Sequence, residues 1–480
     1  MHKGFPIRFI LTLLTLVLCS IVGTSSPQVR GLPDQISDED FWRTITELSE
    51  PSGQYNGDNW ISNEPTIQDV IPPLKQIVKP GGVYLGVGPE QNFTYMWALQ
   101  SKLGFIIDIR RQNMLDVLLF KALFEISPDR ADFVSHLFSR RRPDGLNAST
   151  SAAALMAAYE VAPKEGLAAN IERVRSILAS HKYGLSNDDT ATIEFIYGIF
   201  NRGGPTITAE FASPGGPSPA VPITYTNLMT ATDRNGQAWS YLSSEAAYQY
   251  VRELHRKNLI IPLVGDFAGP STIRKVSDYL KEHNSTVAAF YVSNVEYYLS
   301  DVTLKKFQAN VATLPIDTSS IFIRWAMRTP YVPWNSDSNR LVMTLAPISE
   351  LIDLRKADRA PASFAEILRA TREPQSVVAS MQDPSLRVVS GRVTGIASLK
   401  AGELVRVMLI DNLRPSGLIL EAEVAADSSF TVRNVTPRTY QAIVLRSCRG
   451  CSSSKVAGSP VNVVVSDKDV AGLQLVLDPQ

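Results

Sequence analysis

Reactive and metal-binding side chains are scarce in this sequence. Its 480 residues include only 3 cysteines and 5 histidines, and the histidines lie far apart along the chain. There is no HExxH zinc motif, no GxSxG nucleophile elbow and no phosphate-binding P-loop. The sequence therefore predicts no metal site and none of the common catalytic centres, and it leaves open whether the protein is an enzyme.

An excess of charge of either sign is also missing. The chain has 47 Lys and Arg against 47 Asp and Glu, so its formal net charge is zero. Nucleic-acid-binding proteins usually carry a basic excess, so we predict no nucleic-acid partner. Apolar residues make up 44 % of the chain, which is enough for ordinary cores in about three domains of ~150 residues each.

Long apolar runs are absent except at the N-terminus. Three basic or weakly basic residues (His2, Lys3 and Arg8) precede an apolar run over residues 9–22, and small residues follow it. This order is typical of a signal peptide, and the run is shorter than the ~20 residues of a membrane span. We predict a signal peptide over residues 1–26, export to the periplasm, cell surface or medium, and no integral span after cleavage. A retained N-terminal anchor is the alternative.

Two cysteines remain after the signal peptide, Cys448 and Cys451. In an oxidising compartment, two cysteines three positions apart most simply form one local disulfide. Serines flank the pair on both sides, which indicates a loop rather than the helix start of a thioredoxin-type site. We therefore predict a structural disulfide, with free thiols or a metal or redox site as alternatives.

The middle of the chain alternates short apolar strands with helices. We expect strands near residues 83–88, 105–109, 259–264 and 287–292. Such alternation favours a parallel sheet covered by helices on both faces. We predict an N-terminal extension over residues 27–64, then an α/β domain over residues 65–327 with a helical insertion at about residues 112–258.

The pattern changes near residue 385. From there to the C-terminus the sequence predicts only short alternating strands, separated by turn residues at roughly 8 to 15 positions. This spacing is typical of a small β-sandwich, which we place at residues 385–480. Residues 328–384 carry prolines and charges and are predicted to be a connector with room for one helix at residues 363–370.

Small or polar residues follow the expected strands of the α/β domain. These candidates are Gly86, Gly88, Asp108, Asp266 and Asn294. The carboxyl ends of parallel strands form a crevice in which ligands bind, so we expect the five residues around one crevice. Other interpretations stay open: the glycines can simply make a tight turn, Asp108 can pair with Arg110 or Arg111, and Asp266 can start a helix.

Residues 82–110 resemble the first βαβ unit of class I methyltransferases that use S-adenosylmethionine. Gly86 and Gly88 stand where the strand meets the helix, and Asp108 ends the next strand about 20 residues later. The resemblance implies a Rossmann-like fold and a cofactor crevice for an S-adenosylmethionine-like ligand. The sequence departs from the pattern at Tyr84, where an acid is usual, and at Glu90, where a small residue is usual. Residues 65–327 also resemble a family of uncharacterised exported bacterial proteins.

The C-terminal segment resembles the carboxypeptidase-regulatory-like domains of bacterial surface and secreted proteins. The matching motifs lie at residues 390–393, 427–430 and 434–440. Ser428 and Arg438 stand at turn positions that are usually glycine, which implies strained or rearranged turns. The resemblance implies a structural or adhesive module with an envelope or surface partner.

Two functions follow as hypotheses. The first is an exported, non-catalytic protein that binds a ligand or provides structure on a degenerate methyltransferase-like fold. The second is a transferase-like enzyme that binds a nucleotide or an S-adenosylmethionine-like ligand in the predicted crevice.

Overall fold

The structure is a computed structural model in which most of the chain is described. The described residues are 31–210, 222–327, 341–372, 374–382, 387–396, 403–411, 419–425, 427–435, 437–448 and 455–478. The predicted signal peptide lies outside these residues, as do Cys451 and the side chain of Cys448, so the export and disulfide predictions stay predictions. Among the described residues, no helix has the length and apolar character needed to cross a membrane.

A six-stranded sheet forms the centre of the larger part of the molecule. Its strands are β1 (Val83–Gly86), β2 (Leu103–Asp108), β3 (Ile260–Val264), β4 (Val287–Ser293), β5 (Ile316–Met327) and β6 (Leu341–Pro347), in the spatial order β3-β2-β1-β4-β5-β6. The first five strands are parallel, and β6 pairs antiparallel with β5. Every residue of β1, β2 and β3 is buried, as expected for a parallel sheet covered on both faces. The predicted α/β class with a mostly parallel sheet is confirmed.

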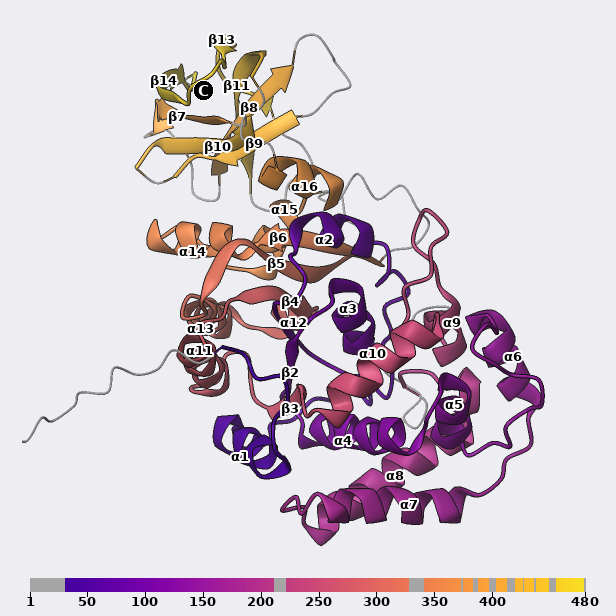
Figure 1. Ribbon diagram of the computed structural model, residues 1–480. Helices are drawn as coiled ribbons and strands as arrows, with labels where there is room; N and C mark the ends of the chain where they lie inside the picture. Colours follow the sequence, from indigo (N-terminus) through magenta and orange to yellow (C-terminus); the bar gives the residue numbers. More distant parts are fainter. Residues whose placement is uncertain are drawn as a thin grey trace, which may run out of the picture.

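Helices cover both faces of this sheet (Figure 1). One face carries α1 (Asp38–Leu48), α11 (Thr272–Glu282), α13 (Asp301–Val311) and α14 (Ile348–Lys356). The other carries α2 (Ile71–Ile77), α3 (Gln91–Leu99), α4 (Arg111–Ile126) and α10 (Glu245–Arg256). The β1–α3 connection and the start of α4 therefore lie on the same side of the sheet, next to the ends of β1 and β2.

The long connection between β2 and β3 is helical, as predicted for residues 112–258. Between α4 and α10 it contains α5 (Arg130–Phe138), α6 (Ala152–Val161), α7 (Leu167–Ser180), α8 (Asn187–Gly203), a 3-10 turn (Gly204–Thr206) and α9 (Tyr225–Thr230). Aromatic side chains join these helices to the sheet. Phe93 of α3 packs edge-to-face on Phe120 and Phe124 of α4, and Phe124 stacks on Phe133 of α5. The insertion thus shares its core with the α/β sheet.

Residues 341–382 differ from the connector expected over residues 328–384. They form β6, α14, α15 (Phe364–Arg369) and α16 (Pro374–Gln382). Strand β6 pairs with β5 over seven residues, and Val377 and Val378 of α16 are fully buried in the core of the α/β domain. Residues 341–382 are therefore packed onto the α/β domain and are not a free linker.

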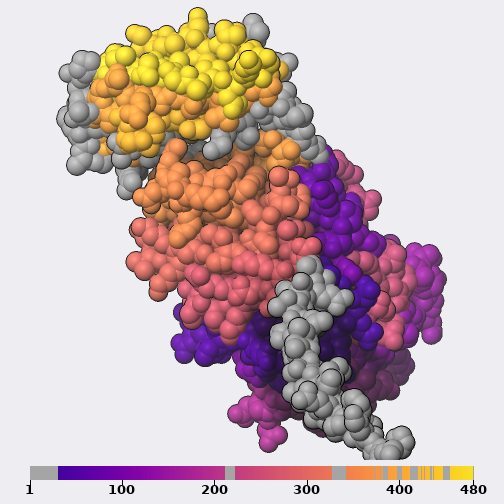
Figure 2. Space-filling model, turned by 60° about the vertical axis from the view of Figure 1, so that its left-hand side comes forward, coloured from indigo at the N-terminus to yellow at the C-terminus, as the bar shows by residue number. Residues whose placement is uncertain are grey.

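The C-terminal region is all-β and forms one end of the molecule (Figure 2). Its strands are β7 (Arg387–Thr394), β8 (Glu403–Asp411), β9 (Ile419–Glu423), β10 (Ser429–Val435), β11 (Thr439–Cys448), β12 (Lys455–Val456), β13 (Val461–Val464) and β14 (Val470–Val476). One sheet has the order β10-β7-β14, and the other has the order β12-β11-β8-β9 with β13 paired to β11. A separate apolar core fills the region, as alternating strands with one buried face require. The coarse prediction of an all-β C-terminal region is confirmed.

The turn before β10 holds a serine in a conformation that favours glycine. Ser428 has a φ of 70°, and its amide donates to the carbonyl of Ala425. A left-handed backbone conformation costs an L-residue ~1–2 kcal/mol, and glycine at this position would not have this cost. Glycine also has more conformational freedom in the unfolded chain, which offsets ~0.5–1 kcal/mol of that gain. We expect Ser428→Gly to stabilise the C-terminal region by about 0.5–1 kcal/mol in chemical unfolding. Ser428→Ala is the control, and an equal gain in both variants would contradict this explanation.

Candidate functional site

The candidate residues of the predicted crevice lie at one edge of the sheet. Gly86 is the last residue of β1, and Asp108 is the last residue of β2. Asp266 follows β3 by two residues, and Asn294 directly follows β4. Because these four strands are parallel, all their carboxyl ends meet at the same edge. Gly86, Asp108, Asp266 and Asn294 therefore lie at one edge of the sheet, and a ligand-binding crevice there stays a prediction.

The chain's own residues 49–64 cross this edge, and we call this segment the strap. It begins at β3, where the Glu50 amide donates to the Val264 carbonyl at 2.8 Å. It continues past β2, where the Gly53 amide donates to the Ile109 carbonyl at 2.8 Å. It ends at β4, where the buried Glu64 carboxylate accepts hydrogen bonds from the hydroxyls of Tyr291 and Ser293. The strap therefore covers the ends of the strands where a cofactor would be expected.

Asp108 is engaged by Arg110 beneath the strap. The Asp108 carboxylate accepts from the Arg110 backbone amide at 2.9 Å and from its guanidinium at 3.1 and 3.3 Å. The same guanidinium donates to the carbonyls of Gly57 and Asp58 in the strap, at 2.9 and 2.7 Å. Asp108 and Arg110 are only 5 % and 7 % exposed. Arg110 thus pairs with the Asp108 carboxylate and fastens the strap at the same time.

Side chains of the same segment occupy the space next to the two glycines. A Cβ atom on Gly86 would lie 2.0 Å from Oδ1 of Asn92 and 2.7 Å from the ring of Tyr84. Gly88 has a φ of 77°, which favours glycine. The Asn92 amide group donates to the carbonyls of Val87 and Gly88 at 3.1 Å each. The glycine turn is therefore closed by the side chain of Asn92.

Asp266 and Asn294 also take part in local structure. The Asp266 carboxylate accepts from the amide of Ala268 at 2.8 Å, which stabilises the loop before α11. Glu50 of the strap, rather than Asp266, accepts the two amides at the start of that helix, from Ser271 and Thr272 at 2.7 Å each. Asn294 precedes the short helix α12 (Val295–Tyr298), and its carbonyl accepts from the amide of Tyr297 at 2.9 Å.

A group of buried polar side chains lies under the strap, and the sequence gave no direct signal for it. We define the buried polar cluster as Trp60, Glu90, Gln91, Asn113 and Asp116, each at most 4 % exposed. Among the described residues, no hydrogen-bond partner exists for either carboxyl oxygen of Glu90, for Oδ1 of Asp116 or for Oε1 of Gln91. Nδ2 of Asn113 and Nε1 of Trp60 are unpartnered in the same part of the chain.

Burial makes the two acids of this cluster hard to ionise. It raises the pKa of Glu90 from 4.5 to about 8, against weaker opposing effects of the Glu90 and Ser62 backbone amides. Burial and the nearby Glu90 charge also raise the pKa of Asp116, although Arg110 opposes this. Glu90 therefore favours the neutral acid at pH 7, and the same physical effect shifts Asp116 toward its neutral form. Glu90 is the residue at which the sequence departs from the methyltransferase pattern.

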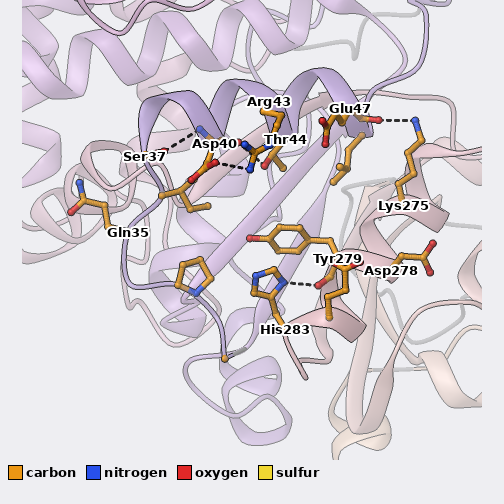
Figure 3. A pocket seen from close by; sticks show the side chains of 15 residues that line it. Gln35, Ser37, Asp40, Arg43, Thr44, Glu47, Lys275, Asp278, Tyr279 and His283 are labelled. Atoms are coloured by element: carbon orange, nitrogen blue, oxygen red, sulfur yellow. Dashed lines mark hydrogen bonds and ion pairs between the residues drawn. The ribbon is translucent and has the colours of Figure 1, made fainter. Parts of the chain in front are cut away.

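A groove with charged and aromatic walls lies elsewhere (Figure 3). It runs between α1 and α11, has a volume of about 1030 Å³, and carries Asp40, Arg43, Glu47, Lys275 and Tyr279 on its walls. Arg43 pairs with Asp40 at 2.6 Å, and Lys275 donates to the Glu47 carbonyl at 2.6 Å. None of the residues predicted from the sequence as site residues lines this groove.

Comparison with known proteins gives a family without an activity. No curated protein matches the chain. A family model described as "Domain of unknown function (DUF7790)" matches residues 59–376. The match covers the sheet, the helical insertion and residues 341–376, and it begins within the strap. The chain therefore belongs to the DUF7790 family of proteins.

Proposed function

We propose that this chain is an exported, non-catalytic protein whose α/β domain is a degenerate methyltransferase-like, Rossmann-like unit. The strand order supports the fold assignment. Strands β2 and β3 are added on one side of β1, and the chain then crosses over to add β4, β5 and β6 on the other side, as in doubly wound sheets. The antiparallel strand at the edge is compatible with it. The N-terminal signal pattern supports export.

One observation carries the proposal of a non-catalytic domain. Arg110 occupies both the carboxylate of Asp108 and the carbonyls of the strap, where a nucleotide ribose would bind in a working cofactor site. A ligand would have to break this buried ion pair and move the strap before it could reach the glycine turn. The side chain of Asn92 also fills the space beside Gly86. The crevice is therefore filled by the protein itself.

For the C-terminal region we propose a carboxypeptidase-regulatory-like module that contacts an envelope or surface partner. Its two small sheets with a common core support this assignment. So does the left-handed turn at Ser428, because glycine is usual at that position of the motif. The module would attach the protein to this partner, while the α/β domain would bind a ligand or serve a structural role.

A transferase-like enzyme is the second candidate. The shared edge of Gly86, Asp108, Asp266 and Asn294 favours it, since these residues come from four different parallel strands or the segments just after them. In this case the strap would open, and Asp108 would exchange Arg110 for ligand hydroxyls.

Thermal unfolding with candidate ligands distinguishes the two. We expect no change in the Tm of the mature protein with S-adenosylmethionine, S-adenosylhomocysteine, NAD or ATP, because the crevice is closed. A ligand at 100 times its Kd would add ~2.7 kcal/mol of stability, which is readily measured. A rise in Tm that Asp108→Asn removes would contradict the non-catalytic proposal and support the transferase-like enzyme.

A further inference from the structure

Among the described residues, the buried polar cluster has more unpartnered acceptor atoms than unpartnered donor atoms, and its two such donors are Nε1 of Trp60 and Nδ2 of Asn113. Both oxygens of Glu90, Oδ1 of Asp116 and Oε1 of Gln91 have no hydrogen-bond partner among the described residues. Oδ2 of Asp58 in the strap, also buried, is a further unpartnered acceptor there. Buried polar atoms in folded proteins are nearly always paired with protein groups, water or ligands. Something outside the described chain is therefore expected to donate to these oxygens.

Helix spacing and mutual electrostatic effects place these groups in one neighbourhood. Asn113 and Asp116 are three residues apart on α4, so they lie on the same face of that helix. The charge of Glu90 acts on Asp116 and on the buried hydroxyls of Tyr225 and Tyr241. The Ser62 amide acts on the carboxyl group of Glu90. The strap, the start of α3 and the first turns of α4 therefore surround the cluster.

The local charges do not balance when the acids ionise. Arg110 is matched by Asp108, to which it is paired on two nitrogens. Arg110 is also the basic group that lowers the pKa of Asp116, while the main effects on Glu90 are burial and the backbone amides of Glu90 and Ser62. Ionised Glu90 and Asp116 would then be two buried negative charges with no cation of their own, which is strongly unfavourable. A positive ligand would remove this penalty.

We propose that the buried polar cluster binds a small ammonium group, either the ammonium ion or a small primary amine, with Glu90 and Asp116 as its main acceptors. Such a cation carries three or four N–H donors, which suits a set of single acceptor oxygens. A divalent metal fits less well, because the described residues hold no group of three or more His, Cys, Asp or Glu side chains suited to a metal. On binding, each carboxylic acid that ionises releases its proton to solvent, so charge is conserved. This inference does not depend on whether the domain is catalytic.

The test is the thermal stability of the mature protein at one pH near 7.5 in equal concentrations of different chloride salts. Choline chloride is the reference, because choline has no N–H donor and is too large for a closed site. We expect ammonium and methylammonium to raise the Tm by about 5 °C over choline at concentrations near 100 times the Kd. Sodium and potassium are expected to leave it near the choline value.

Substitutions of the two acids test whether the ammonium-dependent rise in Tm arises in the buried polar cluster. Glu90→Gln and Asp116→Asn should each lose most of the ammonium-dependent rise, and Glu160→Gln, an exposed acid on α6, should retain it. Two acid variants are included so that the test survives if one of them fails to fold. Calorimetry in buffers of different ionisation heat should detect proton release on binding in the wild type and less in Glu90→Gln.

Three results would overturn the proposal. The first is the same Tm in ammonium, methylammonium and choline. The second is an equal rise with sodium or potassium, which would show a general salt effect instead of hydrogen-bonded recognition. The third is an ammonium-dependent rise that survives in both acid variants, which would place the site elsewhere in the chain.

Discussion

Replacing Glu90 by Gln is expected to make the folded protein more stable than the wild type above pH 8, by about 5 kcal/mol in choline buffer. The reason is burial: Glu90 is 1 % exposed, and its pKa is raised from 4.5 to about 8. Each pH unit of that rise corresponds to ~1.36 kcal/mol. The Gln side chain has nearly the same shape and carries no charge to bury, so it avoids this penalty.

The sign follows from proton binding. Below pH 4.5 both the folded and the unfolded chain hold the proton on Glu90, so this group adds no pH dependence. Between pH 4.5 and about 8 the unfolded chain loses the proton while the folded chain keeps it, so stability falls as the pH rises. Above pH 8 both states are ionised and the loss is complete. The free-energy difference between wild type and variant should therefore grow across this window and then level off.

Chemical unfolding at a series of pH values measures this difference. Comparison with Glu90→Gln removes the contributions of the histidines, which are the same in both proteins. Asp116 is coupled to Glu90, so part of the difference belongs to the pair. The exposed acid Glu160 provides the control, because Glu160→Gln should track the wild type. A constant offset between wild type and Glu90→Gln from pH 5 to 9 would contradict the assignment of a buried neutral acid.

The α/β part of the fold could be predicted because its central strands carry a local signal. Residues 83–86, 103–108 and 260–264 are fully buried, and such strands appear in the sequence as short continuous apolar runs. The C-terminal strands have one buried face and alternate in character, so their type was readable as well. In β7, for example, Val389 and Val393 are buried while Arg392 and Thr394 are exposed.

Strand β6 was missed for a different reason. Its run Leu341–Pro347 is apolar, but prolines and charges on both sides suggested a connector. The strand is placed by antiparallel pairing with β5, for example Ile323 with Leu345. Pairing between separate segments is not encoded in either segment alone. The apolar run at residues 341–346 was the one signal that could have indicated a sixth strand.

For the candidate site, too, the sequence predicted local features but not contacts between distant segments. The sequence indicated which residues follow the strands, since that depends on local pattern. It also left open that Asp108 pairs with Arg110, which is the pairing observed. It could not indicate that residues 49–64 cross the crevice, because a segment rich in Gly, Asn and Ser only predicts a loop. Nor could it indicate that the charge of Glu90 acts on Asp116, because Glu90 lies just before α3 and Asp116 lies in α4.

Arg110→Ala is expected to lower the free energy of unfolding by about 3–5 kcal/mol. It leaves Asp108 as a buried carboxylate whose cation is gone, and losing one partner of a buried pair typically costs this much. It also removes the two hydrogen bonds to the strap carbonyls of Gly57 and Asp58. Amide hydrogen exchange should therefore accelerate in residues 50–64 more than in the sheet.

Two comparisons separate the role of Arg110 from a general effect of losing an arginine. Arg141 pairs with Glu165 at 2.7 Å, but both side chains are more than half exposed, so Arg141→Ala should change stability by less than about 0.5 kcal/mol. Asp108→Asn keeps the strap contacts of Arg110, so its cost should be smaller than that of Arg110→Ala. Combining Asp108→Asn with Arg110→Ala should cost less than the sum of the single changes, since the second change removes the charge left unpaired by the first. Strictly additive losses, with unchanged exchange in the strap, would mean that the pair neither compensates buried charge nor holds the crevice closed.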